Sequence, residues 1–143
     1  MAGNTSIVKR FYDAYNSGDP DFGAEIMESQ VTTVVPGIAP MEGPEPFQAY
    51  LAAFKNAAPD SQMSMDSVTE SDDVVVVEGV FTGTQSGPLV SAQGEVPPTG
   101  RKFAFNFACK FQLSDGLIRT HNVYFDQVAL LSQLGLMPSP GGQ

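Results

Sequence analysis

The feature that most constrains the fold is a strict alternation of large apolar residues with small or polar ones between Lys102 and Leu113. Successive side chains of a β-strand point to opposite faces of the sheet, so an alternation of this length predicts one long strand with a buried and an exposed face. The side chains of the apolar face must line the core or a cavity. They are Phe103, Phe105, Phe107, Cys109, Phe111 and Leu113.

The period of the apolar pattern changes along the chain from that of helices to that of strands. Apolar residues recur at helical spacing from Ile7 to Tyr15 and from Phe47 to Phe54, and Asp19-Pro20 predicts the start of a shorter helix between them. This order predicts an α+β domain, in which three N-terminal helices cover the concave face of a curved antiparallel sheet. Strands are expected at 31–35, 63–69, 74–84, 102–113 and 117–125.

Composition excludes several classes of protein. A formal net charge of −9 opposes contact with nucleic acid, which requires clustered Lys and Arg. No apolar run approaches the roughly 20 residues of a membrane-spanning helix and no secretory pattern begins the chain, so we expect no membrane partner and a cytoplasmic location. One cysteine with one histidine makes neither a disulfide nor a structural zinc site, so no metal is expected. The length of 143 residues suits a single domain over 1–143, with a core from about 6 to 136 and a flexible tail at 137–143.

The end of the last predicted strand carries the residue on which the functional interpretation depends. Asp126 follows that strand directly and precedes a short helical pattern that starts at Gln127. Its carboxylate can cap the helix from an exposed position, or it can be held in an apolar pocket as a proton-transfer group. The two roles can coexist, and the apolar surroundings in the sequence favour the pocket.

The order of the elements resembles the nuclear transport factor 2-like fold, a cone-shaped half-barrel, and the closer resemblance is to its SnoaL-like polyketide cyclase branch. It covers the chain from about Ser6 to Leu136. The segments that carry it are Phe11-Tyr12, Tyr15-Asn16-Ser17-Gly18-Asp19, Gly43 with Phe54, Ala58-Pro59-Asp60, Gly79 to Gly87, Pro98-Thr99-Gly100-Arg101, Asp115-Gly116, and Tyr124-Phe125-Asp126 with Gln133-Leu134-Gly135.

This resemblance implies an enzyme without a cofactor that acts on a hydrophobic, polyketide-like carbonyl compound by aldol-type cyclisation or isomerisation. Asp126 would be its catalytic general acid and base. The chain departs from the family pattern at Gln85 and Cys109, which stand where relatives carry histidines, and a glutamine cannot exchange protons near neutral pH. The alternative is therefore a non-catalytic small-molecule-binding or assembly module of the same fold. Epoxide opening, a third chemistry known in this fold, would need a second acid that the strand pattern does not supply.

Strand alternation also assigns residues to the expected pocket. Thr120, Asn122 and Tyr124 share the parity of Asp126 and are expected to face the ligand. His121 is expected on the outer sheet face or in an interface unless a β-bulge intervenes. Core or strand packing is the alternative for each candidate. The other expected substrate-binding residues are Gln85, Cys109 and Phe107, together with Tyr15 and Tyr50, whose hydroxyls can bind a ketone oxygen.

Two further expectations concern surfaces. The proline- and glycine-rich loop 36–46 is either a lid over the mouth of the pocket or a stiff connector. Val123 and Phe125 are expected to form an apolar patch on the outer sheet face, which predicts a homodimer.

Overall fold

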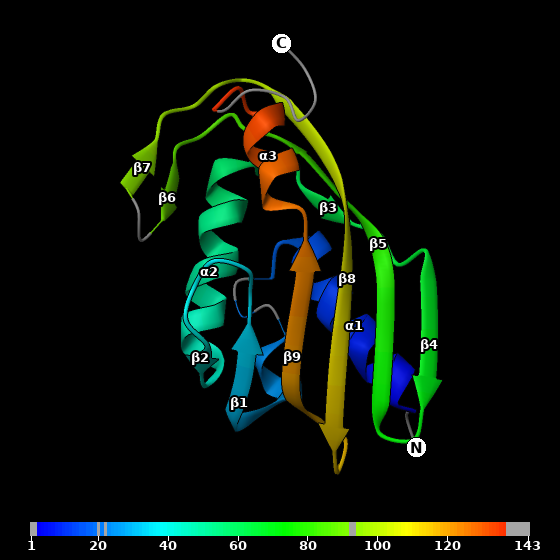
Figure 1. Ribbon diagram of the computed structural model, residues 1–143. Helices are drawn as coiled ribbons and strands as arrows, with labels where there is room; N and C mark the ends of the chain where they lie inside the picture. Colours follow the sequence, from blue (N-terminus) through cyan, green and yellow to red (C-terminus); the bar gives the residue numbers. More distant parts are fainter. Residues whose placement is uncertain (1–2, 20, 22, 92–93, 137–143) are drawn as a thin grey trace.

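The computed structural model describes residues 3–19, 21, 23–91 and 94–136 (Figure 1). The predicted tail at 137–143 lies outside the described residues, as do Pro20 and Phe22 of the predicted second helix. The helices are α1 (Asn4–Ser17), α2 (Pro44–Ala57) and α3 (Gln127–Gln133), with a 3-10 turn at Ala24–Ile26. The strands are β1 (Met27–Val34), β2 (Met41–Glu42), β3 (Gln62–Met63), β4 (Ser67–Ser71), β5 (Val74–Thr84), β6 (Leu89–Ser91), β7 (Gly94–Val96), β8 (Lys102–Ser114) and β9 (Leu117–Phe125).

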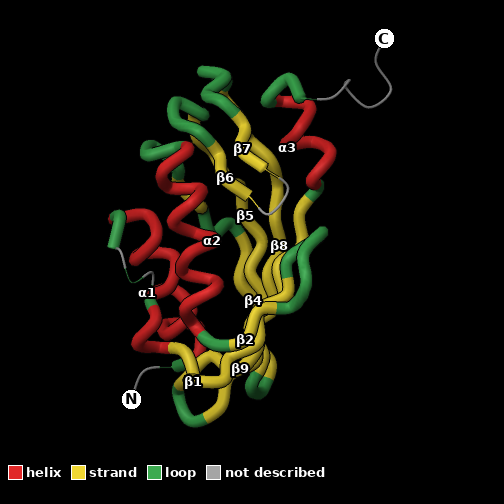
Figure 2. Tube along the Cα trace, turned by 90° about the vertical axis from the view of Figure 1, so that its left-hand side faces the viewer, coloured by secondary structure: helices red, strands yellow, loops and turns green. Residues whose placement is uncertain are grey.

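Seven strands form one curved sheet in the order β2-β1-β9-β8-β5-β3, with β4 also paired to β5. The sheet is mixed rather than wholly antiparallel, because β1 runs parallel to β9. Figure 2 shows α1 and α2 together on one side of the sheet, while α3 follows β9 near the end of the molecule at which the hairpin of β6 and β7 lies. The α+β class and the helix-covered sheet are therefore as predicted.

The predicted second helix is reduced to the 3-10 turn. Gly23 adopts a left-handed conformation with φ of +77°, and the chain is already extended at Met27. The apolar spacing that suggested a helix there instead buries Ile26 and Met27 at the turn and at the start of β1. The third helix of the fold is α3, at the other end of the chain.

The alternation in β8 has the predicted consequence. All six residues of its apolar set are buried, and the strand pairs with β5 without interruption from Val74↔Gln112 to Thr84↔Lys102. The strand predicted at 63–69 is instead split into β3 and β4. Between them the chain passes so close to Gly79 that a Cβ there would overlap the Ser64 carbonyl oxygen.

The hairpin of β6 and β7 has no counterpart among the predicted elements. It packs beside α2 and forms a separate two-stranded sheet. Its strands have only three residues each, too few for a recognisable alternation. Among the described residues, no helix is long and apolar enough to cross a membrane.

Candidate functional site

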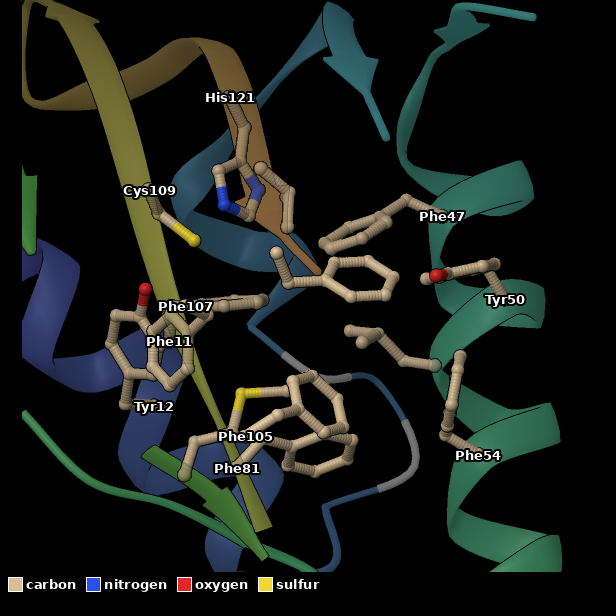
Figure 3. Close-up of a pocket in the computed structure, with 14 residues that line it drawn as sticks. Phe11, Tyr12, Phe47, Tyr50, Phe54, Phe81, Phe105, Phe107, Cys109 and His121 are labelled. Carbon is tan, nitrogen blue, oxygen red and sulfur yellow. The ribbon is translucent and has the colours of Figure 1, made fainter. Parts of the chain in front are cut away.

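A cavity of about 60 Å³ lies between the helices and the concave face of the sheet (Figure 3). Such a volume accommodates a few water molecules and is well below the roughly 300 to 1,000 Å³ of sites for drug-sized ligands. Aromatic and aliphatic side chains dominate its walls. The lining residues are Phe11, Tyr12, Phe47, Tyr50, Leu51, Phe54, Met63, Phe81, Phe105, Phe107, Cys109, His121, Val123 and Phe125.

A groove of about 520 Å³ lies next to this cavity, between α2, α3, the hairpin of β6 and β7, and the loop that follows β1. Pro36 and Ile38 of that loop, with Met41 at the start of β2, form one wall of it. Three residues line both the groove and the cavity, namely Tyr50, Phe54 and Phe125. We call these three side chains the aromatic partition, because their rings are all that the two spaces share.

The faces of β9 are opposite to those predicted. His121, Val123 and Phe125 line the cavity, whereas Tyr124 lies on the outer face with 57% of its surface exposed. The parity relation between His121 and Tyr124 was correct, but the set assigned to the pocket was wrong. Asn122, which pairs with Lys110, is likewise absent from the cavity wall.

A β-bulge explains this reversal. Ile118 pairs with Leu113 of β8, but the next pair is Thr120 with Gln112, so Arg119 is an extra residue in β9. An extra residue exchanges the two faces of the strand beyond it. The buried Ile118 is therefore followed on the same face by His121 instead of Thr120.

The reversal also removes the expected outer patch. Val123 and Phe125 point into the cavity and contribute nothing to an apolar surface outside the sheet. The homodimer stays a prediction without that support.

His121 is the most unusual side chain of the cavity. Its ring stacks on Phe111 at a centroid distance of 4.1 Å and meets Phe11 and Phe47 edge-on at 5.4 and 5.2 Å. Only 2% of its surface is exposed, and neither ring nitrogen has a hydrogen-bond partner in the described part of the chain. Burial lowers the pKa of His121 to about 3, so the imidazole is neutral at physiological pH. The outer position expected for His121 is wrong.

Two further polar side chains lie close to His121. Tyr12, from α1, is fully buried, and among the described residues its hydroxyl has only the weakly polar Cys109 thiol beside it. The nearby Cys109 thiol lies diagonally across from His121 in the register of β8 and β9. Burial raises the pKa of Cys109 to about 12, so it is a protonated thiol and not a nucleophile. We call Tyr12, Cys109 and His121 the cavity floor.

Asp126 lies outside the cavity. It is exposed, and its Oδ1 accepts a hydrogen bond of 3.0 Å from the backbone N–H of Ala129, which makes it the N-cap of α3. The expectation that apolar side chains enclose this carboxylate is wrong, because the chain leaves the sheet at Phe125 and the helix uses the next residue as its cap. Asp126 itself is not among the groove-lining residues, but its neighbours Phe125 and Gln127 are, so we call its position the groove rim.

Gln85 is a structural residue. Its side-chain amide is buried and donates to the carbonyl oxygens of Gly87 and Pro97, both at 3.2 Å. Its Oε1 accepts from the Thr99 hydroxyl at 2.7 Å. These bonds tie together the two ends of the hairpin of β6 and β7, and Gln85 lines neither the cavity nor the groove. The structure therefore does not place it among substrate-binding residues.

The remaining predicted substrate-binding residues differ in whether they line the cavity. Tyr50, Phe107 and Cys109 line the cavity, as expected. Burial raises the pKa of Tyr50 well above its usual value. Tyr15 does not line the cavity, since its hydroxyl lies 2.8 Å from Ser61 Oγ and the Lys55 ammonium sits 4.5 Å from its ring centroid.

The sequence reading missed Tyr12 and His121 as site residues. The pairing that places His121 beside Phe111 becomes apparent only once the bulge is known. No signal existed for Tyr12, which shares its helical spacing with ordinary core residues. Among the described residues, no group of three or more potential metal ligands comes together.

Comparisons with known proteins agree with this architecture. The family model described as "SnoaL-like polyketide cyclase" matches residues 5–134. The chain is 28% identical, over 148 aligned positions, to aklanonic acid methyl ester cyclase DnrD of Streptomyces peucetius, an alignment that covers 99% of this chain and 98% of the relative.

Solved structures show the same similarity. A protein from Jannaschia sp. CCS1 that is assigned as a SnoaL-like polyketide cyclase superimposes with a TM-score of 0.82 at 26% identity, over 94% of this chain and 93% of that one. TsrD from Streptomyces laurentii superimposes with a TM-score of 0.79 at 26% identity, over 93% and 95% of the two chains. The nuclear transport factor 2-like fold that the sequence resemblance implied is confirmed.

Proposed function

Because this chain belongs to the SnoaL-like polyketide cyclase family, we propose that it binds a hydrophobic, carbonyl-bearing compound of the polyketide type and closes a ring in it by an aldol-type reaction. The structural observation that supports this proposal is the shared wall of the cavity and the groove. An apolar site that continues from one space into the other suits an elongated ligand with several rings.

The volumes require a movement of the aromatic partition. The cavity alone, at about 60 Å³, is too small for a polycyclic compound, whereas the groove of about 520 Å³ falls in the range of small-molecule sites. Tyr50 and Phe54 are only partly buried, so a change of their rotamers would join the two spaces. Their rings would then pack on the faces of the ligand.

The reaction itself needs a proton to be removed and returned. A base takes a proton from the carbon next to one carbonyl, that carbon bonds to a second carbonyl carbon of the same molecule, and the resulting alkoxide takes up a proton. In our proposal Asp126 is this base and acid, and it acts on the end of the ligand that lies in the groove. Its Oδ1 already accepts from Ala129, and a carboxylate has further lone pairs for the substrate.

Aklanonic acid methyl ester is the appropriate first substrate, since the names of the curated relatives contain it. We expect Asp126→Asn to lower the rate of its cyclisation about 100-fold or more, the size of effect typical for loss of a general acid or base. The asparagine keeps the helix cap, so folding should be unaffected. Asp66→Asn, at another exposed aspartate away from the groove, is the matched control and should retain the full rate. An Asp126→Asn protein as active as the wild type would remove Asp126 from the mechanism.

A second function is favoured by a specific observation. Among the described residues, no aspartate or glutamate lines the cavity, Gln85 is committed to the hairpin, and the thiol of Cys109 is protonated. A module that binds the same class of ligand without converting it would have these properties. Binding of the ester by the wild-type protein, with no cyclised product above the uncatalysed level, would identify this second function.

A further inference from the structure

Within the part of the chain that the structure describes, three buried side chains carry polar atoms that no strong hydrogen-bond partner satisfies. They are the Tyr12 hydroxyl, which has only the weakly polar Cys109 thiol beside it, the Thr33 hydroxyl and both ring nitrogens of His121. Nearly all buried polar groups in folded proteins are hydrogen-bonded, and an unpartnered one lowers stability. Several such groups side by side therefore call for a functional explanation.

Tyr12 and His121 converge on the same aromatic surroundings. The ring of Phe11 lies 5.1 Å from that of Tyr12 and 5.4 Å from that of His121. The ring of Phe111 lies 6.0 and 4.1 Å from the same two rings. Figure 3 shows the cavity floor on one side of the cavity, with Tyr50 and Phe54 of α2 on the other. The unpartnered atoms of Tyr12 and His121 thus belong to the end of the cavity that is remote from the groove.

We propose that the His121 imidazole and the Tyr12 hydroxyl form a hydrogen-bonding site for a ketone oxygen that enters the cavity ahead of the rest of the ligand. This inference rests on the ligand class proposed above and adds which end of the ligand is buried. The oxygen lies at the cavity floor, and the part of the ligand that reacts remains in the groove.

The chemistry of the two groups suits a carbonyl. A neutral imidazole presents one N–H donor and one acceptor nitrogen, and a phenol presents an O–H donor. Burial keeps His121 neutral, and a neutral imidazole N–H can polarise a carbonyl group without transferring its proton. If both donors bind one ligand oxygen in this apolar cavity, they interact with it more strongly than they would in water.

Thr33 is an internal control that distinguishes a ligand-binding site from a simple packing defect. Its side chain is fully buried on β1 and is paired in register with His121, yet it lines neither the cavity nor the groove. If the unpartnered groups were only imperfections of the core, Thr33 and His121 would behave alike. If the site binds ligand, only Tyr12 and His121 influence affinity.

The test uses two small probes of the same shape, acetophenone and α-methylstyrene. In α-methylstyrene a methylene group replaces the ketone oxygen of acetophenone. Their dissociation constants are measured by calorimetry for the wild type and for Tyr12→Phe, His121→Phe and Thr33→Val. We expect Tyr12→Phe and His121→Phe each to weaken acetophenone binding by about two- to tenfold, as for loss of one hydrogen bond. Binding of α-methylstyrene should change by no more than about twofold in the same variants, and Thr33→Val should leave both constants unchanged.

Equal losses for the two probes would contradict the proposal, as would a loss in Thr33→Val equal to that in His121→Phe, or a wild type that binds neither probe. Thermal unfolding followed by circular dichroism verifies the fold of each variant. Tyr12→Phe keeps the buried ring and carries the test alone if His121→Phe does not fold. The measurement involves no turnover, so selective ketone binding by a protein that forms no cyclised product would support the site while contradicting the cyclisation.

Discussion

The cavity floor and the groove rim at Asp126 use their polar groups in opposite ways. At the rim, the Asp126 carboxylate is exposed and holds the first turn of α3 through Ala129. At the floor, Tyr12 and His121 are buried, and within the described part of the chain neither side chain has a strong hydrogen-bond partner. The comparison shows that Asp126 already stabilises the fold in the free protein, whereas Tyr12 and His121 leave hydrogen-bonding capacity unused there.

The two regions should therefore differ in how they respond to substitution. Removal of a side chain that caps a helix lowers the free energy of unfolding. Removal of a buried polar group that has no partner in the free protein raises it. Four changes, taken from the largest expected effect to the smallest, separate the floor from the rim.

Truncation of the ring beneath His121 should have the largest effect. Phe111 is fully buried and stacks on the imidazole at 4.1 Å. We expect Phe111→Ala to lower the free energy of unfolding by about 3 to 5 kcal/mol, because a large cavity is left in the core. Val128→Ala in α3, at a side chain that is 44% exposed, should change it by less than about 0.5 kcal/mol. Urea denaturation measures both, and similar values for the two variants would show that the floor is loosely packed.

Acid should destabilise the protein through His121. Its pKa is about 3 in the folded state against an ordinary value near 6.5, so the unfolded chain binds a proton that the folded chain does not. Stability is therefore constant with respect to this group above about pH 6.5 and falls by about 1.4 kcal/mol for each pH unit below it. Between pH 7 and pH 5 the loss is about 2 kcal/mol.

The control for this pH dependence is His121→Phe, since the chain contains no other histidine. The slope between pH 7 and pH 5 should disappear in the variant. A slope of unchanged size would mean that another group causes the acid sensitivity and that His121 is not buried in its neutral form.

The same substitution should stabilise the free protein at pH 7.5. Phenylalanine is similar in size and matches the surrounding rings. It also removes two buried nitrogens for which the described residues supply no partner. We expect a gain of about 1 kcal/mol in the free energy of unfolding. A loss of that size would indicate that the imidazole is bonded in the free protein, most directly to Thr33 across the strand pair.

At the rim, loss of the polar side chain should lower the free energy of unfolding instead of raising it. Asp126→Ala removes the N-cap of α3 and should lower the free energy of unfolding by about 1 kcal/mol, whereas Asp126→Asn should change it by a few tenths at most. Thermal denaturation of the two variants side by side measures the difference. Equal stability of the alanine and asparagine variants would show that the cap contributes nothing.

Much of the architecture was predictable from the sequence. The alternation from Phe103 to Leu113 predicted β8 and its buried face, and the predicted strands at 74–84 and 117–125 coincide with β5 and β9. The helix cap at Asp126 was one of the two roles that its position allowed. These features depend on local spacing, which the sequence contains directly.

The candidate site was less predictable because it depends on a single inserted residue. Arg119 adds one position to β9 and thereby moves Asn122 and Tyr124 outward and His121 inward. Nothing in the local spacing marks that bulge. The lack of partners for Tyr12 and His121 is also invisible in the sequence, since it follows from the packing of α1 against two strands.

Nuclear magnetic resonance of the single histidine, labelled with nitrogen-15, tests the central claim most directly. Acetophenone is added to the protein, and the ring nitrogens of His121 and the backbone amide of Ala129 are followed as reporters of the floor and the rim. We predict that a His121 nitrogen resonance shifts with acetophenone but not with α-methylstyrene, while the Ala129 amide responds equally to both. A His121 signal that neither probe moves, beside an Ala129 amide that acetophenone alone shifts, would place the ketone at the rim and contradict the account.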